Sequence, residues 1–138
     1  MRRHLLLPLL LATGWSAAAA ASPIDGLWLT DDRRGVVRIG ACGPHLCGWI
    51  ARVLARGPDV AARDVHNPDP RLRGRTIQGL SILSGFSAAG AGFTGGQAYD
   101  PASGRSYNAR LSPNADGSLT VTGCVLFICQ SKRWTRLR

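Results

Sequence analysis

The segment Asp64-Val65-His66-Asn67-Pro68-Asp69-Pro70 contains the side chains best suited to chemistry. His66, oriented by the carboxylate of Asp64, would be the general base of a hydrolase. The oxygens of Asp64, Asn67 and Asp69 are of the type that binds calcium or magnesium. Neither pattern is complete, because His66 has no nucleophile placed beside it and the acidic residues lack both EF-hand spacing and a bidentate Glu. We therefore expect a rigid turn fixed by its two prolines, with no metal and no catalytic residue, and keep a hydrolase using Asp64 and His66 as a minor alternative.

The N-terminus has the pattern of a secretory signal peptide. Arg2 and Arg3 are followed by the apolar stretch Leu5–Leu11, interrupted by Pro8, and by the alanines at 17–21. This segment is too short to span a bilayer, and no later segment is long and apolar enough to do so. We expect residues 1–21 to be removed, leaving one domain at 22–138 in the bacterial periplasm or secreted; a retained N-terminal anchor is the alternative.

Four cysteines occur as two C-x4-C pairs, Cys42 with Cys47 and Cys124 with Cys129. An even number of cysteines in a small exported domain indicates disulfides. The alternative is a zinc site with four thiolate ligands, although zinc motifs usually space their ligands more closely. We expect the local bridges Cys42–Cys47 and Cys124–Cys129, each closing a short loop.

The chain is strongly basic, with 17 Lys and Arg against 8 acidic residues and a formal net charge of +9. Loss of Arg2 and Arg3 would lower this to +7. Such a charge favours a polyanionic partner. The basic residues are scattered, and no aromatic-rich RNA-binding motif accompanies them, so we expect contact with an anionic envelope surface and not with nucleic acid. A solvated basic surface without a partner is the simpler interpretation.

Short alternations of apolar and polar residues, separated by turn signals, predict about eight strands. Three of the turns begin with Asp or Asn and end with Gly: Asp32–Gly35, Asp100–Gly104 and Asn114–Gly117. Consecutive hairpins form a meander, which loses its edges by closing into an up-and-down barrel. The one long connection, residues 55–75, has room for a short helical turn. The predicted strands cover residues 25–30, 36–41, 46–54, 80–86, 93–100, 105–111, 118–124 and 131–137.

The first and last predicted strands carry Gly26-Leu27-Trp28 and Trp134-Thr135-Arg136. This pairing resembles the lipocalin superfamily, in which a Trp on the first strand lies across the barrel floor and an Arg of the last strand packs over it. The resemblance implies structural roles for Gly26, Trp28, Trp134 and Arg136, with a cation–π contact between Trp28 and Arg136.

A series of motifs in chain order extends this resemblance over the expected mature chain. Together they look like a small exported bacterial family, domain of unknown function twenty-one forty-seven, whose associated fold is lipocalin-like and which implies no settled activity. The chain departs from the family pattern at Thr94, where Trp is common, and at His66, where other polar residues are usual. The motifs are Cys47–Ile50, Asp64–Pro70, Gly95–Pro101 with Gly104 and Tyr107, and Gln130–Arg136.

A lipocalin-like barrel can enclose one small ligand or be filled by its own side chains. We expect a non-catalytic protein without a cofactor, which binds a small apolar or amphiphilic molecule; an acidic head, as in fatty acids, would suit a basic mouth. The alternative is an envelope interaction or structural module with a filled barrel. The side chains expected to face the interior are Val37, Ile39, Trp49, Tyr107, Ala109, Leu111, Leu119 and Val121.

Overall fold

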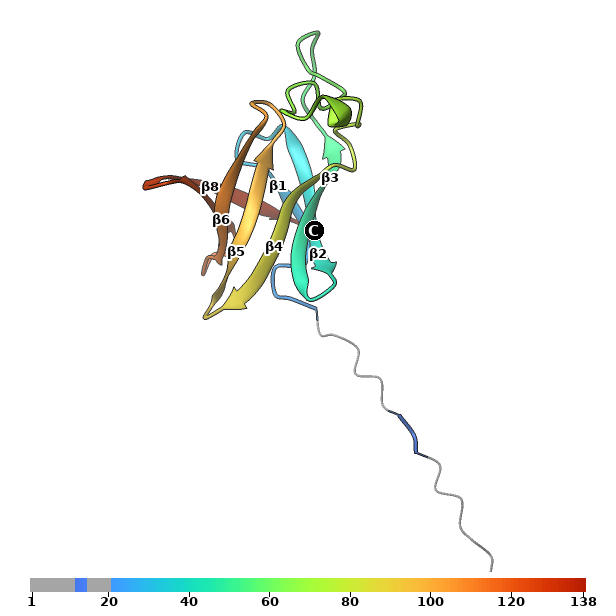
Figure 1. Cartoon of the computed structure of the whole chain (residues 1–138). Helices are drawn as coiled ribbons and strands as arrows, with labels where there is room; N and C mark the ends of the chain where they lie inside the picture. Colours follow the sequence, from blue (N-terminus) through green and yellow to red (C-terminus); the bar gives the residue numbers. More distant parts are fainter. Residues whose placement is uncertain (1–11, 15–20) are drawn as a thin grey trace, which may run out of the picture.

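The computed structural model describes residues 12–14 and 21–138. The expected signal peptide lies mostly outside these residues and stays a prediction. The described chain forms one closed antiparallel barrel (Figure 1). No helix in these residues is long and apolar enough to cross a membrane. The strands are β1 (Gly26–Leu29), β2 (Gly35–Cys42), β3 (His45–Val53), β4 (Ser81–Ala89), β5 (Gly92–Asp100), β6 (Arg105–Pro113), β7 (Leu119–Val125) and β8 (Ile128–Leu137).

Each strand pairs with the next along the chain, and β1 closes the barrel against β8. This confirms the predicted eight-stranded up-and-down barrel. The one long connection follows β3, and the only helical element within it is a single 3-10 turn, η1 (Pro70–Leu72). Asp69 caps this turn by accepting a hydrogen bond from the backbone N–H of Arg71, and Pro70 fixes its first φ angle.

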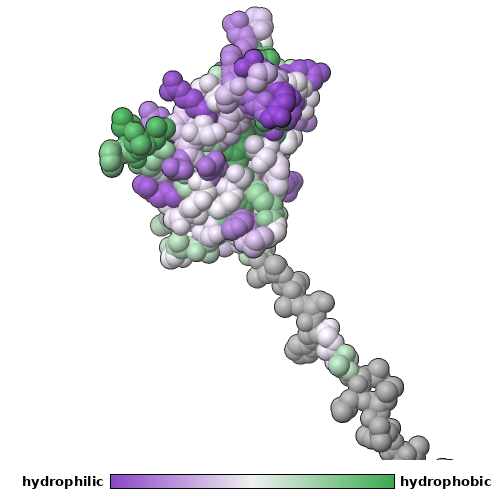
Figure 2. Space-filling model, viewed as in Figure 1, coloured by the Kyte–Doolittle hydropathy of each residue, from purple (hydrophilic) through white to green (hydrophobic). Residues whose placement is uncertain are grey.

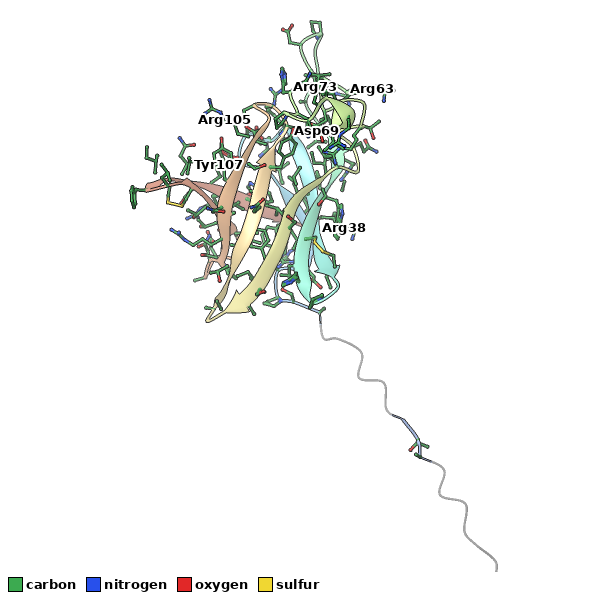
Figure 3. The ribbon with its side chains drawn as sticks, in the orientation of Figure 1. Arg38, Arg63, Asp69, Arg73, Arg105 and Tyr107 are labelled. Carbon is green, nitrogen blue, oxygen red and sulfur yellow. A yellow bond between two sulfur atoms is a disulfide. The ribbon has the colours of Figure 1, made fainter. Side chains whose placement is uncertain are left out.

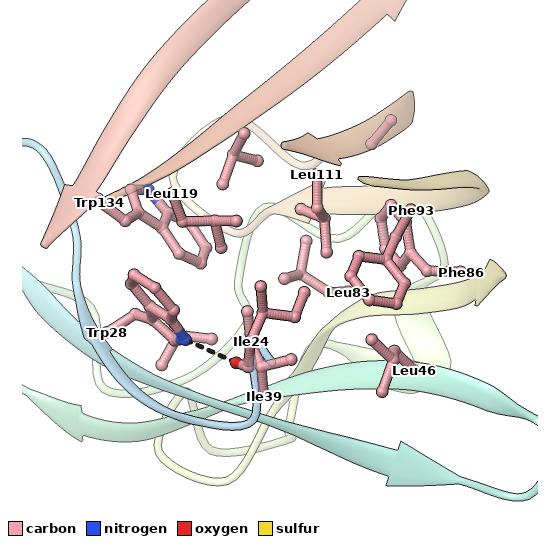
Figure 4. Packing of buried hydrophobic residues seen from close by; sticks show 13 residues of the cluster. Ile24, Trp28, Ile39, Leu46, Leu83, Phe86, Phe93, Leu111, Leu119 and Trp134 are labelled. Carbon is pink, nitrogen blue, oxygen red and sulfur yellow. Dashed lines mark hydrogen bonds between the residues drawn. The ribbon is translucent and has the colours of Figure 1, made fainter. Parts of the chain in front are cut away.

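Buried hydrophobic side chains fill the half of the barrel nearer the β2–β3 and β4–β5 turns (Figure 4). They come from every strand, because residues two apart along a strand face the same side of the sheet. Such packing leaves no room for a ligand in this half. The cluster consists of Ile24, Trp28, Val37, Ile39, Leu46, Leu83, Phe86, Phe93, Ala109, Leu111, Leu119, Val121 and Trp134.

Trp28 and Arg136 close this end of the barrel. The indole is 1 % exposed, donates a hydrogen bond of 2.9 Å to the carbonyl of Ile24, and lies 4.4 Å from the Arg136 guanidinium carbon. The guanidinium also donates to the carbonyls of Asp25 and Pro23, at 2.9 and 2.6 Å. Gly26 has a φ of +133°, and a Cβ there would lie 3.1 Å from Arg136 Nη1. The sequence Gly-x-Trp thus combines a backbone conformation that favours glycine with the indole that the arginine covers.

Both predicted disulfides are confirmed. Cys42–Cys47 links the two strands of the β2–β3 hairpin, and Cys124–Cys129 links those of the β7–β8 hairpin. Each pair spans a tight turn, which brings the two Cα atoms to 5.8 and 4.1 Å respectively. No thiolate remains for the alternative zinc site.

Candidate ligand cavity

Beyond the packed core, the barrel contains a partly open cavity of about 550 Å³. Its walls are inward-facing strand residues, and the segment between β3 and β4, residues 54–80, lies over it; we call this segment the cap loop. Figure 3 shows Arg63, Asp69 and Arg73 of the cap loop at this end of the barrel. The apolar and aromatic lining includes Val37, Ile50, Val53, Val60, Ile77, Ile82, Leu83, Ala98, Tyr99, Tyr107, Val121 and Trp134.

The cap loop is attached to the barrel by a small apolar cluster of its own. Ile77 and Leu80 are buried against Ile50 of β3. Backbone hydrogen bonds hold the loop to itself and to the strand: Ile77 N donates to the carbonyl of Ala62, and Ile50 N donates to that of Leu80. The loop therefore has a defined position over the cavity.

A buried carboxylate provides the second attachment. Asp64 is 0 % exposed and accepts hydrogen bonds from Tyr99 Oη of β5 at 2.5 Å, Asn67 Nδ2 at 2.8 Å and Arg75 Nη2 at 3.0 Å. Burial by itself would raise the pKa of Asp64, but these hydrogen bonds and the charge of Arg75 outweigh it and hold the pKa below its usual value. Burial, together with the hydrogen bond to Asp64 and its charge, raises the pKa of Tyr99 to about 12. Asp64 is thus ionised at neutral pH and joins the cap loop to the barrel wall.

The β5–β6 turn supports the cap loop from below. Asp100 fixes this turn by accepting hydrogen bonds from Ala102 N at 2.9 Å and Ser103 Oγ at 2.8 Å, as expected of a turn that begins with Asp. Gly104 ends it with a φ of +73°, and a Cβ there would overlap the carbonyl oxygen of His66. Glycine is required at this position both by its φ and by the close approach of the cap loop.

Residues 26–136 match the family described as "Uncharacterized protein conserved in bacteria", DUF2147. The chain belongs to the DUF2147 family. Among solved structures it is similar to protein HP1028 from Helicobacter pylori, described as belonging to the lipocalin family. The TM-score is 0.72, the sequence identity is 23 %, and the match covers 83 % of each chain. This likeness shows a lipocalin-like fold. No curated protein matches the chain.

The structure divides the expected interior residues of this DUF2147 protein into three groups. Val37, Tyr107 and Val121 line the cavity, and Val37 and Val121 also belong to the packed cluster, at its boundary with the cavity. A second group, Ile39, Ala109, Leu111 and Leu119, lies in the packed cluster and is absent from the cavity wall. The sequence predicted one set of interior residues, all lining a ligand site. In the structure, side chains fill one half of the barrel interior, and the cavity occupies the other half.

Trp49 forms the third group, because it lies on the outer face and not in the interior as expected. It pairs with Arg38, whose side chain is exposed, and its ring is 3.9 Å from where a Cβ of Gly40 would stand. Its neighbours Gly48 and Ile50 are the buried residues. Because alternate residues of a strand face opposite sides, Trp49 must point outward.

The predicted rigid turn at 64–70 is present, and its polar groups bond to one another. Asn67 Oδ1 accepts from Asp69 N at 2.9 Å, and Asp69 Oδ2 pairs with Arg71 Nη2 at 2.9 Å. Within the described residues no hydrogen bond joins His66 to Asp64, whose oxygens are taken by other donors. Sequence reasoning missed the partner Tyr99, since 35 positions separate it from Asp64.

The charged side chains that line the cavity are of mixed sign, so the lining is not basic as expected. Lys132 Nζ lies 3.4 Å from Asp31 Oδ2, which neutralises the one lysine of the chain. Carboxylates outnumber the cations: the charged residues of the lining are Asp31, Asp32, Asp59 and Asp100 against Arg34 and Lys132.

Proposed function

We propose that this DUF2147 protein binds one small apolar or amphiphilic molecule in the cavity beneath the cap loop, without chemical conversion. The volume of about 550 Å³ carries this proposal. It lies within the range of roughly 300–1,000 Å³ that is usual for small-molecule sites. A predominantly apolar wall with a few polar groups at the rim is the lining that such sites have.

A binding role without catalysis is supported by how the polar groups are used. The carboxylate of Asp64 is buried and serves to attach the cap loop. Asn67 and Arg75 donate hydrogen bonds to this carboxylate, so these polar groups serve the attachment of the cap loop as well. We place the protein in the periplasm, since two disulfides fit an oxidising compartment.

The charged residues that line the cavity restrict the head group that the ligand can carry. Asp31 and Asp32 pair with Lys132 and Arg34, which leaves Asp59 and Asp100, among the described residues, as the carboxylates of the lining without an ion pair. They would repel an acidic head, which argues against a fatty acid and for a neutral or cationic amphiphile. Probes of equal chain length that end in a carboxylate, an alcohol or an amine separate these cases. We expect the alcohol and the amine to bind at least as tightly as the acid.

Filling the cavity tests the proposal directly. Ala98 lines the cavity from β5 and packs against the core, so Ala98→Phe would occupy the space that a ligand needs. Ala115→Phe makes the same change in the exposed β6–β7 turn and serves as the control. We expect Ala98→Phe to weaken binding of a fatty alcohol probe by at least about tenfold, and Ala115→Phe to leave it unchanged.

Circular dichroism shows whether both variants fold, and native mass spectrometry of the wild-type protein detects a ligand that co-purifies. Equal affinities in the two variants would place the probe outside the cavity. A wild-type protein that binds none of the three probes and carries no ligand would favour the alternative, an envelope interaction module.

A further inference from the structure

The β7–β8 hairpin ends in four large apolar side chains that no other part of the described chain covers. Val125, Leu126, Phe127 and Ile128 are 51, 87, 98 and 76 % exposed. Figure 2 shows them as a compact hydrophobic knob on the molecular surface, and Figure 1 shows the hairpin standing out from the barrel wall. We call these four residues the hairpin tip. Contiguous exposed apolar groups of this kind mark interaction surfaces in soluble proteins.

The hairpin projects because β1 is too short to accompany β8. Within the described residues β1 pairs with β8 only at Thr135–Leu137, so β8 from Ile128 to Trp134 is paired with β7 alone. A hollow of about 260 Å³ lies between the hairpin and the barrel wall, lined by Gln97 and Asn108 on one side and by Val125 and Leu126 of the tip on the other. The tip is therefore free to meet an external surface.

The tip is held in shape before any contact is made. Cys124 and Cys129 are paired directly behind it and joined by a disulfide, and Val125 pairs with Ile128 across a two-residue turn. Leu126 in this turn has a φ of +53°, a conformation that leucine rarely adopts. Two-residue hairpin turns favour Gly and Asn, whereas this turn carries Leu126 and Phe127. Both positions of the turn therefore present exposed apolar side chains.

The segment that contains β6, β7 and β8 is rich in basic residues. From Pro101 to Arg138 there are six basic residues and one acidic residue, Asp116, a formal charge of +5 out of the whole chain's +9. Arg110 is exposed on β6, in register with Thr122 of the hairpin stem. Lys132 and Arg133 pair with Asp31 and Asp116, and Arg136 packs on Trp28. Arg105 and Arg110 of β6 are exposed and form no ion pair within the described residues.

We propose that the hairpin tip inserts into the interface of an anionic lipid bilayer, with Arg105 and Arg110 of β6 at the head groups. Apolar insertion and attraction to anionic lipid together are what peripheral membrane binding requires. This site is independent of the ligand cavity.

Co-sedimentation with vesicles tests this with matched variants of the whole mature chain. Phe127→Asn removes the most exposed apolar side chain, and Val65→Asn makes a comparable change at a 48 % exposed residue of the cap loop. On vesicles of phosphatidylglycerol and phosphatidylcholine we expect Phe127→Asn to weaken binding about tenfold and Val65→Asn to have little effect. Binding should fall with added salt and be lost on phosphatidylcholine alone.

The charge is tested by a second pair. R105Q/R110Q should weaken binding to the anionic vesicles several-fold more than R38Q/R52Q, which removes the same charge from β2 and β3. Equal losses in Phe127→Asn and Val65→Asn, equal losses in the two double variants, or no binding by the wild type would each overturn the proposal. A wild-type dimer that Phe127→Asn dissociates would assign the tip to a second copy and would also overturn it. Phe127→Asn should keep its affinity for the cavity probe, so this proposal and the proposed function fail separately.

Discussion

Gly104→Ala tests whether the cap loop rests on the β5–β6 turn. Gly104 and Gly117 both end turns that begin with Asp or Asn, and their φ angles are +73° and +86°. Alanine in this left-handed region costs about 1–2 kcal/mol at either position. Only at Gly104 would the new Cβ meet another segment, the backbone carbonyl of His66; at Gly117 nothing lies within 4 Å.

Gly117→Ala is therefore the matched control. We expect Gly117→Ala to lower the free energy of unfolding by about 1–2 kcal/mol, and Gly104→Ala to lower it by about 1–3 kcal/mol more, as overpacking does. Urea unfolding at neutral pH measures both variants. The chemistry of the two substitutions is the same, so the difference between them reports the contact with the cap loop.

Amide hydrogen exchange locates the damage. The N–H groups of Asp64, Asn67 and Ile77 are hydrogen-bonded within the cap loop, and they should exchange faster in Gly104→Ala than in Gly117→Ala. If the two variants lose equal stability and cap-loop exchange is unchanged in both, the loop does not rest on this turn. The cavity would then lack the cover that the structure gives it.

Two other substitutions test the two ends of the barrel. Tyr99→Phe removes a hydrogen bond to the buried carboxylate of Asp64 and should cost about 1.5–3 kcal/mol at neutral pH by urea unfolding. The pKa of Tyr99 is raised from 10.0 in the unfolded chain to about 12 in the folded protein, so the wild type should lose this stabilisation as pH rises between those values. The pKa of Asp64 is lowered on folding, so the stability that its carboxylate contributes should be lost as pH falls through the lowered value. If the stability of Tyr99→Phe depends on pH as that of the wild type does, both expectations are contradicted. Arg136→Ala removes a cation–π contact and two hydrogen bonds and should lower the free energy of unfolding by about 2–3 kcal/mol. Arg133→Ala removes only an exposed ion pair and should lower it by about 0–1 kcal/mol. Equal losses of stability in the two variants would contradict the role of Arg136.

Local patterns were sufficient for the strands and the turns. Alternation predicted the eight strands to within a few residues, because one face of each strand is dry and the other is wet. The Asp–Gly and Asn–Gly turns and the two short Cys–Cys loops were predictable for the same reason, since every partner lies within five positions of the other. Trp28 and Arg136 are far apart in sequence, and the resemblance to lipocalins supplied their pairing.

Trp49 shows where alternation fails. The stretch Leu46-Cys47-Gly48-Trp49-Ile50-Ala51 has apolar residues at both odd and even positions, so the pattern does not say which face is inward. Only pairing with β2, which sets Trp49 beside the exposed Arg38, decides it. The composition of the cavity wall also depends on tertiary contacts, because cap-loop residues such as Ile77 belong to it only once the loop folds back over the barrel.

The sequence by itself determined the all-β class, the meander, the local disulfides and the excess of positive charge, because each depends on residue type and short spacing. Tertiary structure decided which half of the barrel is filled and which is hollow, that Asp64 is a buried attachment point, and that carboxylates outnumber cations at the cavity. It also decided that the hairpin tip stands free, since that follows from how far β1 extends along β8. These features depend on contacts between residues many positions apart, and such contacts exist only once the barrel has closed.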